Sequence, residues 1–332
     1  MSAASTPNPR ALLGLASSAA RVAARRARFG PRRPSWTFGF EALVEGLRST
    51  RQRTGRLPIV EQRRAWDELA MPSPARAAVQ FTQAPEFSIP STWCHARARS
   101  EGGPVVLFLH GGAYNFGSLA TYGDFIARLA LASGARVLFV DYRLAPEHPF
   151  PAALDDASTV YDELTRSVDP RRIVIAGDSA GGGLTIATLV RLRDRRAPLP
   201  SGAILVAPWV DLVDENHDED PDDWITGAWG AAFGDAYRAG KPKDHPEISP
   251  ARADLRGLPR MLVQIGTADL LHPQVSSFVS VLRAADVPVE VEEARDMVHD
   301  WHFFAPVHAP SRAPFESMGR FVRASTAGLR AG

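Results

Sequence analysis

The feature that most constrains this chain is the run from Ile173 to Gly183, IVIAGDSAGGG. Residues 173–176 are apolar and mostly β-branched, as in a strand buried on both faces, and residues 184–193 carry apolar side chains at helical spacing. Between them, residues 177–181 have the form G-x-S-x-G, the strained turn that holds a nucleophilic serine clear of the backbone. The next helix would point its free amides at an oxygen that becomes charged. We therefore predict that Ser179 is a nucleophile, although these residues alone are equally typical of a glycine-rich turn before a helix.

The composition limits the class of protein. The chain has 332 residues, 45% of them hydrophobic and 23% charged, which suits one large α/β domain with an accessory part. The formal net charge of +1 gives no support to a nucleic-acid partner. Cys94 is the single cysteine, which excludes an intramolecular disulfide and fits a cytoplasmic protein.

The N-terminal part of the chain has helical patterns. Residues 11–24 are predicted to form an amphipathic helix with arginines opposite its apolar face. That face carries Leu12, Leu13, Leu15, Ala19, Val22 and Ala23. A secretory signal would have a basic region before a more apolar core, and no apolar run reaches the ~18 residues that span a bilayer. We expect this helix to dock onto the protein's own core, with weak contact to a lipid surface as the alternative.

From about residue 77 the pattern changes to alternating strands and helices. Besides residues 173–176, strands are predicted at 78–81, 92–96, 105–109, 137–140, 203–207, 261–265 and 287–291. Helices are predicted at 38–47 and 60–69 before this point, and at 122–132, 151–164, 275–284 and 315–329 after it. The alternation predicts an α/β fold with a mostly parallel, doubly wound sheet, in which ligands bind beyond the carboxyl ends of the strands. We therefore divide the chain into a helical segment, residues 1–76, and an α/β domain, residues 77–332.

The alternation stops between about residues 209 and 258, which we interpret as an insertion. Its acidic run, residues 214–223, is expected to be a solvated loop, because blocks of like charge are usually solvated and the spacing of a calcium-binding loop is absent. Four aromatic residues follow at helical spacing: Trp224, Trp229, Phe233 and Tyr237. They either line a pocket, which we favour, or anchor an inserted helix to the core.

A second motif follows the strand at residues 105–109. It is His110-Gly111-Gly112-Ala113, in which adjacent glycines let backbone amides approach an oxyanion without a Cβ in the way. Such donors matter in carbonyl hydrolysis, where the loss of one costs roughly 2.7–4 kcal/mol. A flexible loop after a strand is the alternative interpretation.

With these motifs in place, the chain resembles the hormone-sensitive-lipase family of α/β-hydrolases, carboxylesterases with an H-G-G-G loop. The resemblance rests on residues 110–112, on DYRLAPEHPFPA at residues 141–152, and on GDSAGG at residues 177–182, in the family's order and separations. It covers the chain from about Gln80 to the C-terminus. Residues 1–74 have the position of the family's N-terminal cap, and the insertion at 209–258 would add to that cap.

The resemblance implies a catalytic triad of Ser179, Asp269 and His299. His299 would act as the general base and return the proton to the leaving group, while Asp269 would fix the tautomer of the imidazole. Two departures from the family pattern lie here: Leu270 replaces a proline, and Asp300 replaces the glycine after the histidine. The second departure leaves open a transfer of the base role to His302.

The oxyanion hole implied by the resemblance comprises Gly111, Gly112, Ala113 and Ala180. Gly112, Ala113 and Ala180 would donate N–H groups, and Gly111 would shape the turn. Ala113 stands in place of the family's third glycine, which restricts φ and could shift the loop.

Other polar residues of the motifs are expected to be structural. Asp178 would hold the turn around Ser179 through hydrogen bonds. A buried polar network behind the site would comprise Arg143, Glu147, His148 and Asp156.

These observations predict a serine carboxylic ester hydrolase that acts through an acyl-serine intermediate and needs no cofactor or metal ion. Its substrates would be small-to-medium apolar esters, with a lactone or an acetylated alcohol such as a sterol fitting equally well. The predicted pocket side chains are Tyr114, Phe116, Trp209, Trp224 and Trp229. The alternative is a catalytically silent relative that binds a small ligand, which the presence of His299 disfavours. Amide hydrolysis usually requires a large gating domain, and a homodimer is expected only by analogy.

Overall fold

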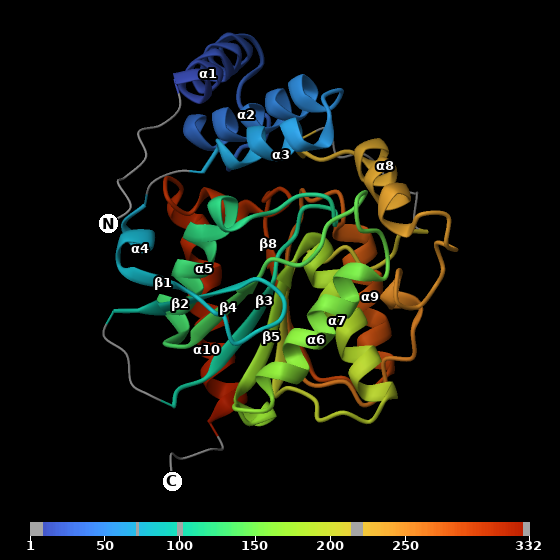
Figure 1. The fold of residues 1–332 in the computed structure, drawn as a ribbon. Helices are drawn as coiled ribbons and strands as arrows, with labels where there is room; N and C mark the ends of the chain where they lie inside the picture. Colours follow the sequence, from blue (N-terminus) through green and yellow to red (C-terminus); the bar gives the residue numbers. More distant parts are fainter. Residues whose placement is uncertain (1–8, 71–72, 98–101, 214–221, 328–332) are drawn as a thin grey trace.

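The computed structural model describes residues 9–70, 73–97, 102–213 and 222–327. An eight-stranded sheet in the order β1-β2-β4-β3-β5-β6-β7-β8 forms its centre (Figure 1). The strands are β1 (Val79–Gln83), β2 (Ser91–Ala96), β3 (Val105–Leu109), β4 (Arg136–Val140), β5 (Ile173–Asp178), β6 (Gly202–Val206), β7 (Met261–Gly266) and β8 (Val289–Ala294). β2 is antiparallel to β1 and β4, and every other pair is parallel. The predicted mostly parallel α/β sheet is confirmed.

The middle of the sheet is buried on both faces. All residues of β3, β5 and β6 are buried, as their continuous apolar runs predict. In the register of these strands, Leu107 lies opposite Ile175 and Ile175 opposite Ala203. The carboxyl ends of β3 and β5 therefore meet at one edge, which brings the loop after Leu109 next to Ser179.

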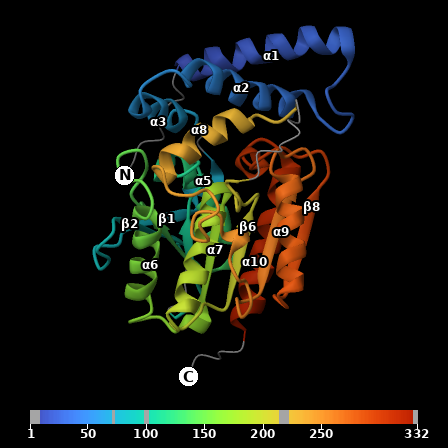
Figure 2. The ribbon, with the colours of Figure 1, turned by 90° about the vertical axis from the view of Figure 1, so that its right-hand side faces the viewer.

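Helices cover both faces of the sheet, with α6, α7 and α9 on one face and α5 and α10 on the other (Figure 2). Their bounds are α5 (Leu119–Ser133), α6 (Ala152–Leu164), α7 (Ser179–Asp194), α9 (His272–Ala284) and α10 (Ala313–Thr326). A Cβ at Gly319 of α10 would lie 2.2 Å from the carbonyl oxygen of Ala132 in α5, so only glycine permits this close packing.

The N-terminal helices lie over the carboxyl ends of the parallel strands together with α8 (Figures 1 and 2). They are α1 (Pro9–Phe29), α2 (Phe38–Thr54) and α3 (Ile59–Asp67), with the short α4 (Pro74–Ala77) before β1; α8 spans Gly227–Arg238. We call α1–α3 and α8 the cap. The buried carboxylate of Glu41 in α2 binds Arg25 at 2.6 Å and Arg26 at 2.9 Å, which ties α1 to α2.

Several elements have bounds that differ from the predicted ones; α7 begins five residues earlier than predicted, and α5 and α9 three residues earlier. The N-terminal helix runs from Pro9 to Phe29 rather than over residues 11–24. On its predicted apolar face, Val22 is buried and Ala23 is exposed. The side chains of Leu12, Leu13 and Leu15 are not among those that the structure describes. The last strand begins two residues later than predicted because residues of this edge strand are half exposed and give a weak apolar signal. In the described ranges, no helix combines the length and the apolar character needed to cross a membrane.

Candidate active site

Ser179 stands at the junction of β5 and α7 in a left-handed backbone conformation, with φ 49°. Strand β5 and helix α7 approach each other closely on both sides of this serine. A Cβ at Gly177 would lie 2.3 Å from the carbonyl oxygen of Gly181, and one at Gly181 would lie 2.0 Å from that of Leu109. The two glycines of the G-x-S-x-G motif therefore permit the backbone contacts that hold Ser179 at the edge of the sheet.

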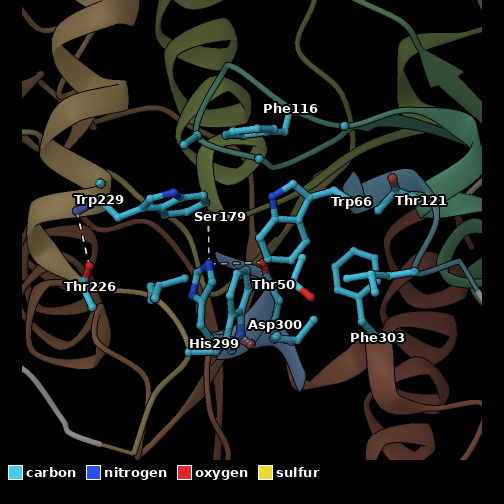
Figure 3. Close-up of a pocket in the computed structure, with 18 of the residues that line it drawn as sticks. Thr50, Trp66, Phe116, Thr121, Ser179, Thr226, Trp229, His299, Asp300 and Phe303 are labelled. Carbon is cyan, nitrogen blue, oxygen red and sulfur yellow. Dashed lines mark hydrogen bonds and ion pairs between the residues drawn. The ribbon is translucent and has the colours of Figure 1, made fainter. Parts of the chain in front are cut away.

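Two further loops bring an imidazole and a carboxylate to Ser179, and Figure 3 shows the imidazole of His299 beside the serine. The Nε2 atom of His299 lies 2.9 Å from the Oγ atom of Ser179. On the other side of the ring, Nδ1 lies 3.0 Å from Oδ2 and 3.1 Å from Oδ1 of Asp269. Asp269 follows β7 and His299 follows β8, so all three side chains come from carboxyl ends of parallel strands. This is the geometry of a nucleophile, a base and an orienting acid.

His302 lies elsewhere. Its Nε2 atom is 3.1 Å from the side-chain oxygen of Gln264 in β7, and burial lowers its pKa to about 3. The structure thus brings His299 to the serine, whereas His302 is buried against β7. The left-handed backbone of Asp300, with φ 50°, makes this possible because aspartate tolerates the conformation that glycine would adopt there.

The loop after β3 places free amides near Ser179. In the part of the chain that the structure describes, the N–H groups of Gly112 and Ala113 have no acceptor, and the N–H of Ala180 belongs to the first turn of α7, whose amides lack partners within the helix. Gly112 has φ 104° and Ala113 φ 52°, so the replacement of the third glycine does not prevent a left-handed conformation.

Gly111 differs from the other predicted members of the oxyanion hole. Its amide donates to Oδ1 of Asp178 at 2.9 Å, so it has no free N–H, and only its role in shaping the turn stands. Oδ2 of Asp178 accepts from the hydroxyl of Tyr122 at 2.7 Å. The predicted structural role of Asp178 is confirmed, since this buried carboxylate joins the loop after β3 to the turn around Ser179.

The predicted buried network behind the site is wrong in part. Arg143 pairs with the buried Asp156 at 2.7 Å, but the arginine side chain itself is exposed. Glu147 instead reaches Arg63 of α3 at 2.8 Å, and His148 is exposed. The segment therefore contributes one anchor to α6 and one to the cap.

A cavity of about 790 Å³ opens in front of Ser179, between the sheet edge and the cap. Its aromatic walls are formed by Trp66, Phe116, Trp209, Trp224, Trp229 and Phe303, several of which Figure 3 shows around His299. Of the predicted pocket residues, Tyr114 does not line it; its ring stacks on Tyr237 at 3.7 Å and anchors α8. Phe233 likewise packs edge-on against Phe116. The aromatic residues of the insertion thus divide between pocket wall and anchor.

Asp223 is a residue of the site that sequence reasoning missed. Residues 214–221 of the acidic run lie outside the described residues, but Asp223 is buried, which contradicts the expected solvated loop at this position. Its carboxylate accepts the amides of Leu270 at 2.8 Å and of His299 at 3.2 Å, so it spans the two loops that carry the acid and the base. Its own carbonyl accepts two hydrogen bonds from Arg48 of α2, at 2.9 and 2.8 Å.

Carboxylates dominate the electrostatics around His299. Burial lowers the pKa of His299, but the charges of Asp269 and Asp300 outweigh it and raise the pKa to about 10. Oδ2 of Asp300 lies 3.2 Å from the same Nε2 atom that faces Ser179. Burial in turn raises the pKa of Asp300 well above its usual range, and that of Asp223 to about 7.

Within the described ranges, no group of three or more histidine, cysteine, aspartate and glutamate side chains is arranged to hold a metal ion. The polar groups within reach of Ser179 include the imidazole of His299 and the free amides of the loop after β3. These groups suffice for acyl transfer to a serine hydroxyl.

Comparisons with known proteins point to the same chemistry. A family model described as the α/β-hydrolase fold matches residues 106–303. The acetyl-hydrolase of Streptomyces hygroscopicus is 38% identical over 235 residues, which make up 69% of this chain and 79% of that protein. Carboxylesterase NlhH of Mycobacterium tuberculosis is 34% identical over 241 residues, covering 69% of this chain and 75% of the relative.

Solved structures agree with these relatives. An esterase from the bacterial hormone-sensitive lipase family superposes with a TM-score of 0.80 at 33% identity, covering 86% of this chain and 98% of the other. A second esterase structure, EstE5 soaked with p-nitrophenyl butyrate, gives a TM-score of 0.77 at 29% identity over 95% of this chain and 99% of that one. Likeness of this extent in both sequence and structure shows that the chain belongs to the hormone-sensitive-lipase family of α/β-hydrolases and is a carboxylic ester hydrolase.

Proposed function

We propose that the protein hydrolyses small-to-medium apolar esters through an acyl-serine intermediate, with Ser179, His299 and Asp269 as its triad. The observation that carries the proposal is the line of contacts from Asp269 through His299 to Ser179, at 3.0 and 2.9 Å, facing a largely apolar cavity. The known esterase activity of the family requires a nucleophile, a base and an oxyanion site, and these groups supply all three.

The reaction proceeds in two steps. His299 takes the hydroxyl proton of Ser179 while Oγ attacks the ester carbonyl, and the amides of Gly112, Ala113 and Ala180 stabilise the oxyanion. The imidazolium then protonates the leaving alcohol, which leaves the acyl group on Ser179. Water activated by His299 releases the acid in the reverse order of proton transfers.

The cavity supports a substrate with a sizeable apolar portion. A volume of about 790 Å³ exceeds what a minimal ester would fill, and the walls are mainly aromatic and aliphatic. Two relatives are named acetyl-hydrolase and putative acetyl-hydrolase, which supports a short acyl group and therefore a substrate whose bulk lies on its alcohol side. Acetylated bulky alcohols, including sterols, and lactones are within this class.

Hydrolysis of p-nitrophenyl esters from acetate to palmitate, by the full chain and by Ser179→Ala, tests the proposal. We expect turnover that depends on Ser179 and is highest for short acyl chains. Mass spectrometry after reaction with a fluorophosphonate should find a single adduct on Ser179. Turnover that survives Ser179→Ala would overturn the acyl-serine mechanism, and a maximum at palmitate would overturn the substrate class.

A catalytically silent ligand-binding protein is the competing function. It predicts no fluorophosphonate adduct and no hydrolysis of p-nitrophenyl esters, bulky acetates or lactones. The contact between Ser179 and His299 argues against it, because a protein that only binds a ligand has no need to hold a base 2.9 Å from a serine hydroxyl.

A further inference from the structure

Asp300 contacts the catalytic base and lines the same cavity, and the proposed mechanism does not use it. Its Oδ2 atom is 3.2 Å from Nε2 of His299, and the side chain lines the cavity (Figure 3). Oδ1 is buried and has no hydrogen-bond partner among the described residues, and the residue as a whole is only 5% exposed. Buried polar atoms of native proteins almost always have a partner, so this oxygen is the kind of group that a bound ligand satisfies.

Two other polar side chains that line the cavity have partners within the protein. Tyr122 donates its hydroxyl to Asp178 at 2.7 Å. The carboxylate of Asp124 accepts from Arg128 at 2.7 Å and also from Ser73. Asp300 therefore differs from Asp124, another carboxylate that lines the cavity, because both oxygens of Asp124 accept hydrogen bonds.

The geometry of ester hydrolysis determines which part of a substrate lies near Asp300. The carbonyl oxygen points to the amides of Gly112 and Ala113, whereas the leaving oxygen receives its proton from Nε2 of His299. Because Asp300 contacts that same nitrogen, a group carried close to the leaving oxygen comes within its reach. Asp300 consequently faces the alcohol portion of the ester rather than the acyl portion.

The surroundings also indicate the chemistry of that group. Burial raises the pKa of Asp300, whereas the imidazole of His299 beside it favours the carboxylate, so the partner of Asp300 has to suit both protonation states. An ammonium group would carry a charge into a cavity with apolar walls at a large desolvation cost. A hydroxyl group both donates and accepts, so it pairs with this carboxyl in either protonation state.

We propose that Asp300 binds a hydroxyl group of the alcohol portion, on the carbon adjacent to the one that carries the ester oxygen. The site then prefers monoesters of vicinal diols and polyols to esters of simple alkanols. This inference rests on the proposed function, because it places the scissile ester between Ser179 and His299. Asp300 acts as a specificity-determining residue, and the substrate hydroxyl completes its hydrogen bonds.

The test compares 2-hydroxyethyl butyrate with propyl butyrate, which carries a methyl group where the first ester has its hydroxyl. We expect kcat/KM of the full chain to favour the hydroxylated ester by about tenfold or more, the size of one hydrogen bond to a buried group. Asp300→Gly should bring the ratio close to that of uncatalysed hydrolysis of the two esters. Glycine suits the backbone here, because φ is 50°, so this variant is expected to fold.

Two further variants sharpen the comparison. Asp300→Asn keeps an acceptor and a donor at the same place and should retain part of the preference. Asp124→Asn alters a cavity carboxylate whose oxygens are already paired, and it should keep the ratio of the full chain. Because each ratio is measured within one variant, a general change in activity cancels.

The outcomes separate this inference from the proposed function. Ser179-dependent hydrolysis of both esters at equal kcat/KM would overturn the role of Asp300 and leave the esterase mechanism standing. A preference that persists in Asp300→Gly would assign hydroxyl recognition to another residue and also overturn it. Absence of hydrolysis together with absence of a fluorophosphonate adduct would overturn both.

Discussion

The two ring nitrogens of His299 contact oxygen atoms of different side chains, and these contacts determine how readily the imidazole accepts a proton. Nδ1 faces Asp269, whereas Nε2 faces both Ser179 and Asp300. A base placed between carboxylates is held more strongly in its protonated form, which cannot accept the proton of a serine. The combined effect of Asp269 and Asp300 on the pKa of His299 therefore determines the pH above which the enzyme is active.

The two histidines near the site should respond differently to removal. His299→Ala is expected to lower kcat by about a thousandfold or more, since the serine loses its base. His302→Ala removes a buried side chain that contacts Gln264, so it should reduce the free energy of unfolding while most activity per folded molecule remains. Steady-state kinetics and urea denaturation on both variants check this, and a larger loss of kcat in His302→Ala would reverse the assignment.

The pH dependence follows from the same contacts. Activity requires neutral His299, and a pKa of about 10 predicts that kcat/KM still rises with pH above 8. Removing the carboxyl of Asp300 takes away a negative charge at Nε2, so Asp300→Gly should move this rise to lower pH by about one unit. The remaining charged groups around the ring, Asp269 and Asp223, stay in place.

Alkyl-ester hydrolysis followed in a pH-stat gives the profile for both proteins. Asp124→Asn is the matched control, and its profile should coincide with that of the full chain. A rise that stays at the same pH in Asp300→Gly would mean that Asp300 is uncharged throughout this range.

At the scale of elements, the segment 222–226 joins three parts of the molecule. Asp223 accepts the amides of Leu270 and His299, and the indole of Trp224 donates to the carbonyl oxygen of His299 at 2.7 Å. Arg51 of α2 donates to the carbonyl of Trp224 at 2.9 Å. The two loops that carry the proposed base and acid are thus held by a segment of the insertion, which α2 of the cap holds in turn.

Asp223→Ala should separate the two triad loops. Two buried amides lose their acceptor, each at about 1–3 kcal/mol, so the free energy of unfolding falls and kcat falls more than KM changes. Asp222→Ala removes the neighbouring carboxylate, which pairs with Arg33 near the surface, and should cost under about 1 kcal/mol. Equal kinetics for the two variants would show that Asp223 does not position the loops.

The strands that carry the site could be predicted well, and the insertion could not. Residues 105–109 were predicted and observed as a strand because a buried parallel strand is continuously apolar. The burial of Asp223 had no such signal, because its acidic neighbours favour solvation and its acceptor role depends on amides distant in sequence. The hydrogen bond of the Gly111 amide could not be predicted either, since its acceptor, Asp178, lies 67 residues away in the sequence.

For the whole molecule, the docking of the cap decides whether the site is complete. Trp36, Phe40 and Val44 form one buried cluster with Val298 and Phe304, on either side of His299. Arg33 adds an ion pair to Asp296 at 3.1 Å. Helical spacing in residues 38–47 predicted α2 but said nothing of this partner surface, because the pattern shows that a face is buried without showing against what.

Deleting residues 1–29 tests this docking. Glu41 would lose Arg25 and Arg26 and keep only the longer contact to Arg32, at 3.9 Å, while the face of α2 against which α1 packs would lose its cover. We expect a lower Tm and a higher KM, and partial recovery of Tm when Glu41→Gln is added to the deletion. Thermal unfolding and ester kinetics measure both effects; an unchanged Tm would show that α1 contributes nothing to the docking.

The cavity draws part of its walls from stretches of sequence that the chemistry does not use. Leu43, Leu47, Trp66 and Trp229 belong to the cap, whereas the nucleophile, the base and the free amides follow strands of the sheet. Substitutions at these cap positions can therefore change the range of substrates without altering the groups that carry out the reaction. A combinatorial library limited to these four positions should therefore yield new specificities at a high rate, whereas Trp224, which is both a cavity wall and a hydrogen-bond donor to the base loop, should tolerate almost no replacement.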